Sequence, residues 1–202
     1  VCLLQIGPHR EPMHVSSTLY FSNPVSANAS ALAAEVSRLF PKFAGQVSAP
    51  GEGGSNNNLL RLGDTIIAIL DFDLPQPPEA LEDAFKVNFT WPEARQAIAQ
   101  HKSHVVLAVV GEQQGFENVT GAAQALAMAA LALAGLHGAI AVFWAPSLAL
   151  LRGKSVASGI EDIQAGRAPL DLWVAFSPWV DREKRTVGLL TIGLQGFVGR
   201  EI

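Results

Sequence analysis

The sequence predicts an α/β (α+β) sandwich in which helices pack on a mixed sheet of about seven strands. Apolar residues make up 49% of the 202 residues and charged residues only 16%, so a sizeable core is available. Segments in which apolar and polar residues alternate, as in β-strands, follow segments with the 3.6-residue apolar period of helices along the chain. This order indicates a layered architecture. Because no proline-rich linker divides the chain, we expect one domain over 13–202 with sub-layers 13–111 and 112–202, after an irregular segment 1–12.

The first half of the chain has the element order of the ferredoxin-like unit, β-α-β-β-α-β. Its hairpin is the best-defined part, because Gly63-Asp64 supplies the positive φ that a tight two-residue turn requires. The fully apolar run 105–110 is suited to a central strand. The expected strands are 13–21, 59–62, 65–72 and 105–110, and the expected helices are 27–40, 79–85 and one between Thr90 and Lys102.

The second half contains 118–151, a stretch without any charged residue that is long enough to cross a bilayer. Gly135 and Gly138 interrupt this stretch, and its first part is mostly alanine, so a buried helix and a buried strand are favoured over a membrane span. The expected helices of this half are 120–134 and 155–164, and the expected strands are 139–144, 170–176 and 186–194. A charged loop over 181–185 joins the last two strands.

His101 and His104 are the most suggestive pair of side chains, since two histidines at this spacing can bind a metal ion or serve in catalysis. A metal site needs a third ligand, which the sequence does not identify. The alternative role is architectural. Thr90 and Glu93 match a capping box at a helix start, and His101 falls in the last turn, where polar side chains interact with free carbonyl groups. We favour this boundary role between a helix and a strand.

Asp71 and Asp73 flank Phe72 at the end of an apolar strand and point to the same side of it. Paired carboxylates in this position can bind a divalent cation or share acid–base duties. The alternation of the strand also explains them, because it exposes both carboxylates where the strand ends. If a metal site exists, we expect its ligands among Asp71, Asp73, His101 and His104.

Other motifs point away from an enzyme. No Gly-x-Ser-x-Gly sequence occurs, and Gly51-Glu-Gly-Gly lacks the Gly-Lys-Ser/Thr ending of a phosphate-binding loop. The single cysteine, Cys2, excludes an internal disulfide bond and fits a cytoplasmic protein. A net charge of −4 without any basic run argues against nucleic-acid binding. We therefore assign no catalytic residues and expect no cofactor.

Trp179 is the candidate for a protein-binding surface, because it follows Pro178 and precedes a charged turn. Trp144 and Trp173 lie in predicted strands and are assigned to the core. Irregular loops over 45–58, 73–90 and 178–185 are suited to recognition. The expected partner-binding residues are Trp179, Asp181, Arg182, Glu52 and Asp73.

Three segments resemble a bacterial domain-of-unknown-function family, number forty-two sixty-one. They are 91–109, which contains Trp91-Pro-Glu-Ala and His101-Lys-Ser-His104, then the apolar helix leading into 139–144, and lastly 191–202. The resemblance covers roughly residues 13–202. The family carries no assigned catalytic residues, so none transfer to this chain. Similar domains look like accessory proteins from bacterial secretion or toxin neighbourhoods, an association that does not by itself define a function.

The function expected from the sequence is the binding of another protein without catalysis. The mildly acidic charge suits a basic partner, so the narrower expectation is an immunity protein that neutralises a secreted, type VI-like toxin. Two alternatives remain open. One is a metal-dependent hydrolase that uses the Asp and His side chains named above, and the other is a scaffold or accessory subunit of a secretion system.

Overall fold

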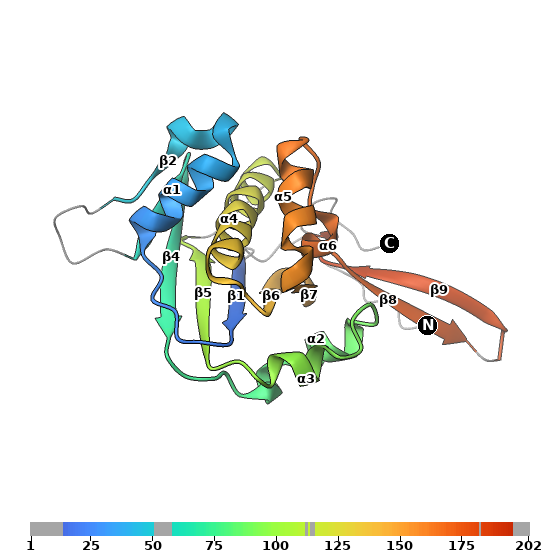
Figure 1. The fold of residues 1–202 in the computed structure, drawn as a ribbon. Helices are drawn as coiled ribbons and strands as arrows, with labels where there is room; N and C mark the ends of the chain where they lie inside the picture. Colours follow the sequence, from blue (N-terminus) through green and yellow to red (C-terminus); the bar gives the residue numbers. More distant parts are fainter. Residues whose placement is uncertain (1–13, 51–57, 112, 114–115, 182, 196–202) are drawn as a thin grey trace.

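The computed structural model describes residues 14–50, 58–111, 113, 116–181 and 183–195, and its centre is a seven-stranded sheet (Figure 1). The strands lie in the order β2-β3-β4-β5-β1-β6-β7, and every neighbouring pair is antiparallel. The expected α+β class is confirmed, with an antiparallel sheet where a mixed one was expected. The strands are Ser16–Phe21 (β1), Val47–Ser48 (β2), Leu59–Leu62 (β3), Thr65–Phe72 (β4), Ser103–Val109 (β5), Ala141–Trp144 (β6) and Ala149–Arg152 (β7).

A ferredoxin-like unit is present, but it is built from different elements than the sequence predicted. β5 and β6 are both antiparallel to β1, which lies between them, so they run parallel to each other. Helix α4 (Phe116–His137) joins them and completes a split β-α-β unit. In the same way, β1 and β4 run parallel on either side of β5, and α1 (Ala29–Leu39) lies in their connection. The second crossover helix is therefore α4, whereas the helix before β5 was expected in that role.

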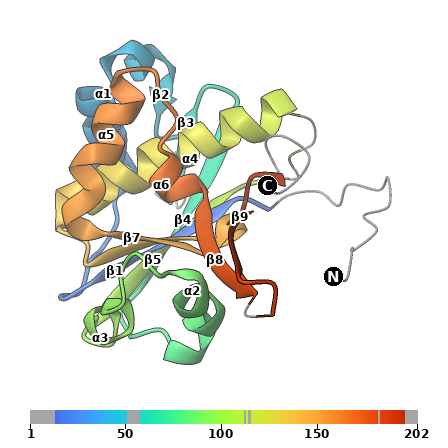
Figure 2. The same ribbon diagram turned by 90° about the vertical axis from the view of Figure 1, so that its right-hand side faces the viewer.

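Helices cover the two faces of the sheet unequally (Figure 2). α1, α4 and α5 (Val156–Gln164) pack together on one face, over the larger apolar cluster. α2 (Glu82–Val87) and α3 (Ala94–Ile98) lie on the other face and form a smaller cluster with Tyr20, Ala141 and Leu150 of the sheet. These three sheet residues belong to β1, β6 and β7, so the short helices cover only that side of the second face.

α4 is the central helix of the core. It is long and apolar enough to cross a membrane by length and composition, but 72% of its most apolar window is buried inside the structure. Its many alanine side chains are small, so α1, α5 and the sheet can pack closely against it. The helix thus has the burial of a core helix, as its alanine-rich sequence favours.

Two strands lie outside the main sheet. β8 (Ala175–Asp181) and β9 (Thr186–Ile192) pair with each other as an antiparallel hairpin. This hairpin projects from the body of the molecule, as Figure 1 shows in red. We call residues 175–192 the arm.

The segment expected as a strand over 170–176 begins as a helix instead. α6 (Leu170–Trp173) starts after Pro169, whose carbonyl accepts a hydrogen bond from Trp173 N–H at 3.1 Å. The turn places Leu172 and Trp173 in the core, where they are 1% and 6% exposed. The assignment of Trp173 to the core is confirmed. The prediction that it lies in a strand is wrong, because burial of two side chains adjacent in sequence favours a helical turn here.

The capping box expected at the start of α3 is absent. α3 begins at Ala94 and has no side-chain hydrogen bond at its N-cap, Glu93. Thr90 Oγ1 donates instead to Asn88 Oδ1 at 3.3 Å. The reason is that the turn over 91–93 follows Thr90, so the helix starts too late for this hydroxyl to reach its first N–H groups.

Candidate protein-binding surface

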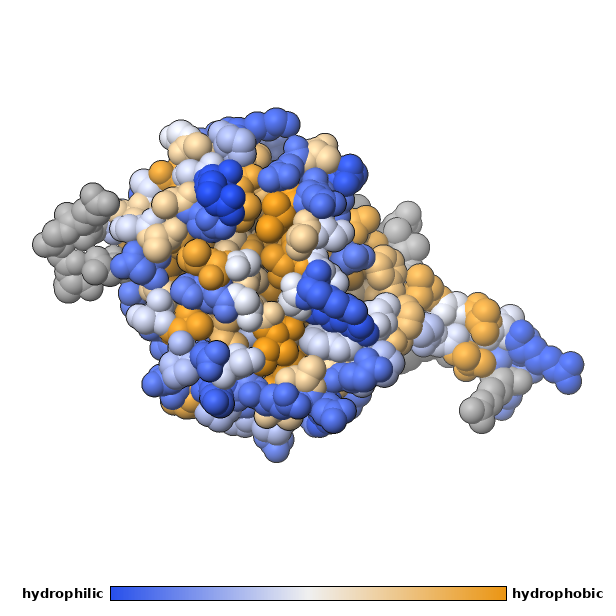
Figure 3. All heavy atoms as spheres, in the orientation of Figure 1, coloured by the Kyte–Doolittle hydropathy of each residue, from blue (hydrophilic) through white to orange (hydrophobic). Residues whose placement is uncertain are grey.

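One face of the arm is apolar along most of its length. The register pairs Pro178 with Leu189 and Val180 with Val187, and residues directly opposite each other in a ribbon point to the same face. Val180 is 65% exposed, Val187 79% and Leu189 52%. The described part of the chain therefore leaves this face uncovered, and Figure 3 shows apolar side chains along the projecting arm. We call these four residues the apolar face of the arm.

The opposite face of the arm is shaped by Trp179. This residue lies across from Gly188 in the register, and a Cβ atom built on Gly188 would come within 2.4 Å of Cε2 of the indole. The indole thus rests on the glycine backbone, which stabilises the ribbon where a larger residue would lift the ring. Trp179 nevertheless remains 50% exposed, and Leu190 on the same face is 46% exposed.

Asp181 organises the turn at the end of the arm. Its Oδ1 atom accepts hydrogen bonds from Glu183 N–H and Lys184 N–H, each at 3.0 Å, in an Asx-type turn. Its Oδ2 atom lies 3.9 Å from Lys184 Nζ. Arg185, the fourth described charge of this turn, takes a positive φ of 52°. The full turn 181–185 has two acidic and three basic residues, a net charge of +1, whereas the exposed side chains Val180, Val187 and Leu189 of the two strands are apolar.

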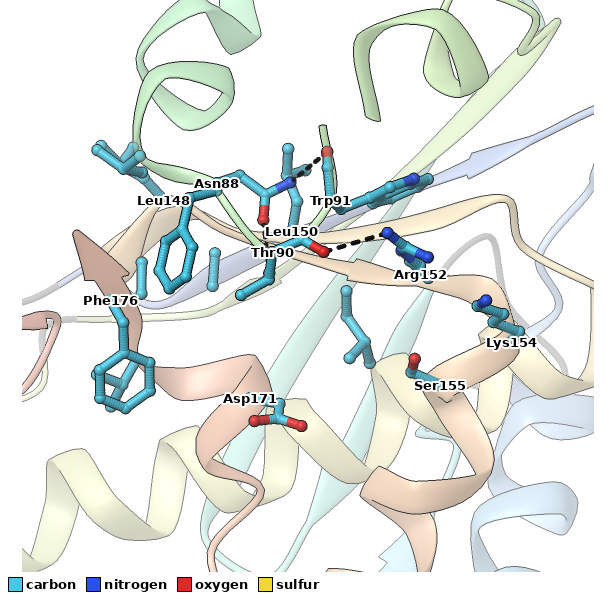
Figure 4. Close-up of a pocket in the computed structure, with 16 residues that line it drawn as sticks. Asn88, Thr90, Trp91, Leu148, Leu150, Arg152, Lys154, Ser155, Asp171 and Phe176 are labelled. Carbon is cyan, nitrogen blue, oxygen red and sulfur yellow. Dashed lines mark hydrogen bonds between the residues drawn. The ribbon is translucent and has the colours of Figure 1, made fainter. Parts of the chain in front are cut away.

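A cavity of about 310 Å³ lies at the base of the arm, between the edge strand β7, the connection from α2 to α3 and the start of β8. Figure 4 shows Arg152 and Lys154 at one end of this cavity and Leu148 and Phe176 at the other. Phe176 belongs to the arm, so the arm forms part of the wall of this cavity.

Arg152 is already engaged within the cavity. Its guanidinium donates to the carbonyl oxygen of Thr90 at 3.1 Å and lies 5.4 Å from the centre of the Trp91 ring. It also lies 3.6 Å from a carboxylate oxygen of Glu93. Ser155 lines the cavity, but no histidine or cysteine is among its described lining residues. Lys154 and Asp171 also line the cavity.

His101 and His104 lie close together, but each contacts a backbone group of the connection between β4 and α2 through a ring nitrogen. His101 Nε2 accepts from Gln76 N–H at 2.8 Å, so its Nδ1 carries the ring proton and donates to Ile98 O. His104 Nδ1 contacts Leu74 O at 2.9 Å. Burial disfavours the charged form and lowers the pKa of His104 below its ordinary value, against the opposing effect of the hydrogen bond to Leu74.

Tyr20 completes this polar cluster. Its hydroxyl donates to Gln76 Oε1 at 2.7 Å, and its ring meets that of His101 edge-on at 5.0 Å between centroids. Burial raises the pKa of Tyr20 well above its usual range. The hydrogen bonds of the cluster fix the connection after β4, and the boundary role expected for His101 agrees with its hydrogen bond to Ile98.

The structure does not bring the expected metal ligands together. Phe72 pairs with His104 in the register, whereas Asp71 pairs with Val105, so Asp71 and His104 lie on opposite faces of the sheet. Asp71 and Asp73 are both exposed. Among the residues that the structure describes, no group of three His, Cys, Asp or Glu side chains is placed to hold a metal ion.

The expected partner-binding residues fall into three groups. Trp179 and Asp181 lie on the arm, while Asp73 lies after β4 in a separate exposed position. Glu52 and Arg182 lie outside the described residues. Sequence reasoning missed Val180, Val187 and Leu189, although the apolar residues on both sides of a charged turn were a signal for an exposed hairpin.

Comparisons with known proteins add no relative to this picture, since no family model, curated protein or solved structure matches the chain.

Proposed function

We propose that this chain is a non-enzymatic protein-binding domain whose arm packs against a partner protein. The observation that carries the proposal is the apolar face formed by Pro178, Val180, Val187 and Leu189 on a hairpin that projects from the body. A two-stranded ribbon without further packing is marginally stable in water. Exposed apolar patches that gather on one element, rather than scattering singly, are typical of interaction surfaces.

Energetic considerations support this role. Fully burying a Val or Leu side chain contributes roughly 1.5–3 kcal/mol, and the arm offers three such side chains that are more than half exposed. Trp179 adds a large aromatic side chain of the type that is enriched at the centre of interfaces. Its contact with Gly188 restricts the ring before binding, so association removes less conformational entropy.

The composition of the arm favours a partner with an apolar recess. Its turn over 181–185 carries a net charge of +1, so the acidic excess behind the net charge of −4 resides elsewhere on the chain. A basic toxin domain, the narrower expectation from the sequence, is supported by that net charge and by the family resemblance, and not by the arm. The proposal is therefore binding of a protein through the arm, with a toxin as one partner to be tested.

The experiment compares the wild type with Val187→Glu and with Leu136→Glu, a matched control. Val187 lies on the apolar face of the arm, whereas Leu136, 43% exposed, lies near the end of α4. Each tagged protein is produced in the native host and recovered under mild conditions, after circular dichroism has verified its fold. We expect a partner with the wild type and the control, and none with Val187→Glu. Recovery of the wild type as a monomer without any other chain, or equal recovery with Val187→Glu, contradicts the proposal.

A further inference from the structure

A second apolar surface is also left uncovered by the described part of the chain. Alternation along β4 and β5 places Ile66, Ala68, Leu70 and Phe72 on one side of the sheet together with Val106, Ala108 and Val110. This is the side that carries α2 and α3, but those helices pack over β1, β6 and β7. Leu70 is 46% exposed, Phe72 38% and Val110 51%. We call these seven residues the open face.

We infer that two copies of this chain associate, with the arm of each copy packed on the open face of the other. The inference rests on the proposed function of the arm and names its partner as a second copy. Val187, Val180 and Leu189 of one copy would lie against Leu70, Val110 and their neighbours in the other.

The two surfaces match in form. A seven-residue strand of the arm spans roughly 23 Å at 3.3 Å per residue, and β4, with eight residues, spans slightly more. Two β layers pack face to face with their apolar side chains interdigitated. Small residues on the open face, Ala68 and Ala108, lie side by side in the register and leave room for larger ones from the arm. The arm is thus a suitable cover for the open face.

A second copy satisfies both surfaces at once. A two-fold dimer is isologous, so the same contact forms twice and each chain contributes one arm and one open face. Interfaces of standard size bury roughly 800 Å² per partner, so a stable dimer needs both patches rather than the arm alone. An unrelated protein that covered the arm alone would leave the open face in water.

The test measures mass by sedimentation and light scattering across a concentration series. We expect the wild type at twice the 21.4 kDa of the chain, and both Val187→Glu in the arm and Leu70→Glu in the open face as monomers. Leu136→Glu, outside both surfaces, should remain a dimer. If Leu70→Glu fails to fold, Val110→Glu replaces it, since Val110 is 51% exposed at the end of β5.

Mixing the two monomeric variants gives the sharpest result. Val187→Glu retains an intact open face and Leu70→Glu retains an intact arm, so a mixed dimer with one native contact should form and dissociate more readily than the wild type. A wild type that is monomeric at every concentration overturns the inference. A dimer that survives Leu70→Glu, or one that survives Val187→Glu, also overturns it, because the contact is then arm to arm or sheet to sheet.

The outcome separates this inference from the proposed function. If the wild type is monomeric and Val187→Glu still abolishes recovery of another protein, the arm binds a foreign partner and only the second copy is wrong. If Val187→Glu changes neither mass nor recovery, both are wrong.

Discussion

The indole of Trp179 rests on Gly188, its cross-strand partner in the arm, and this contact fixes the form of the projecting hairpin. Glycine in a strand interior normally weakens it, because it has no side chain to pack. Here its missing side chain leaves room for the indole, whose Cε2 atom lies 2.4 Å from the position that a Cβ atom would take. The large aromatic residue is thereby held in place on an element with little other packing.

Gly188→Ala should displace the ring of Trp179. The new Cβ atom would meet indole atoms at about 2.4–2.5 Å, so the ring must move. We expect a shift of the Trp179 signal in ¹⁹F NMR of fluorotryptophan-labelled protein, with the signals of Trp91, Trp144 and Trp173 unchanged. Gly121→Ala is the control, because a Cβ atom there meets nothing within 4 Å. An unmoved Trp179 signal contradicts the contact.

Tyr20→Phe should lower the free energy of unfolding by about 1 kcal/mol. The change removes the hydroxyl that donates to Gln76 Oε1 at 2.7 Å and leaves the apolar packing of the fully buried ring in place. Urea unfolding followed by fluorescence measures the loss. A variant as stable as the wild type would show that this hydrogen bond adds nothing to the connection after β4.

Stability should fall as the pH drops below about 6.5, the ordinary pKa of histidine. Burial lowers the pKa of His104 in the folded protein, so the unfolded chain binds a proton more readily in this range. The contribution of His104 is complete above the unfolded pKa and is lost as the pH falls through the folded one. Unfolding in urea at pH 7.5 and at pH 5.5 measures the loss. The difference in unfolding free energy between the two pH values should shrink in His104→Gln and persist in His14→Gln, whose site is exposed. An equal difference in the wild type and both variants contradicts the role given to His104.

Zinc, manganese and magnesium should leave the thermal midpoint unchanged. Both ring nitrogens of His101 and one of His104 contact backbone groups, and Asp71 lies on the other face of the sheet from His104. A metal that binds the folded state alone would raise the midpoint, and the rise would grow with the logarithm of the metal concentration over its Kd. A rise that disappears in His104→Gln would instead revive the metal-dependent hydrolase.

Local sequence patterns correctly predicted the elements whose geometry depends on residues that are close in the sequence. The hairpin of β3 and β4 begins and ends where expected, because Gly63, at a φ of 56°, sets the turn. β5 was recognised from its apolar run, and α4 from its alanine-rich stretch. In each case the decisive interactions lie within the segment, so the sequence alone contains the signal.

Spatial neighbours were not predictable in the same way. The helix before β5 was expected to complete the ferredoxin-like unit, because it stands next in the chain. The unit is completed by α4 and β6, and only the pairing of β1 with both β5 and β6 decides this. Likewise, the residues 170–173 have a strand-like composition, yet packing of Leu172 and Trp173 in the core makes them helical.

The candidate surface was predicted in part. Trp179 stood out beside Pro178 and a charged turn, and it lies on the arm. Val180 was missed because 178–185 was expected to be an irregular loop, whereas residues up to Asp181 belong to β8. Val187 and Leu189 were missed because apolar residues in a strand normally indicate a buried face. Whether such a strand joins a sheet or projects from it depends on contacts distant in the sequence, which periodicity does not reveal.

Site-specific photo-crosslinking from position 187 tests the central claim, that the arm binds a protein, most directly. A photoreactive phenylalanine replaces Val187, which is 79% exposed on the apolar face, and in a second protein it replaces Leu136 as the control. After illumination of native host cells, we predict a discrete crosslinked adduct, with a second copy or with another protein, from position 187 and none from position 136. No adduct from position 187, or equal adducts from both positions, would contradict the claim.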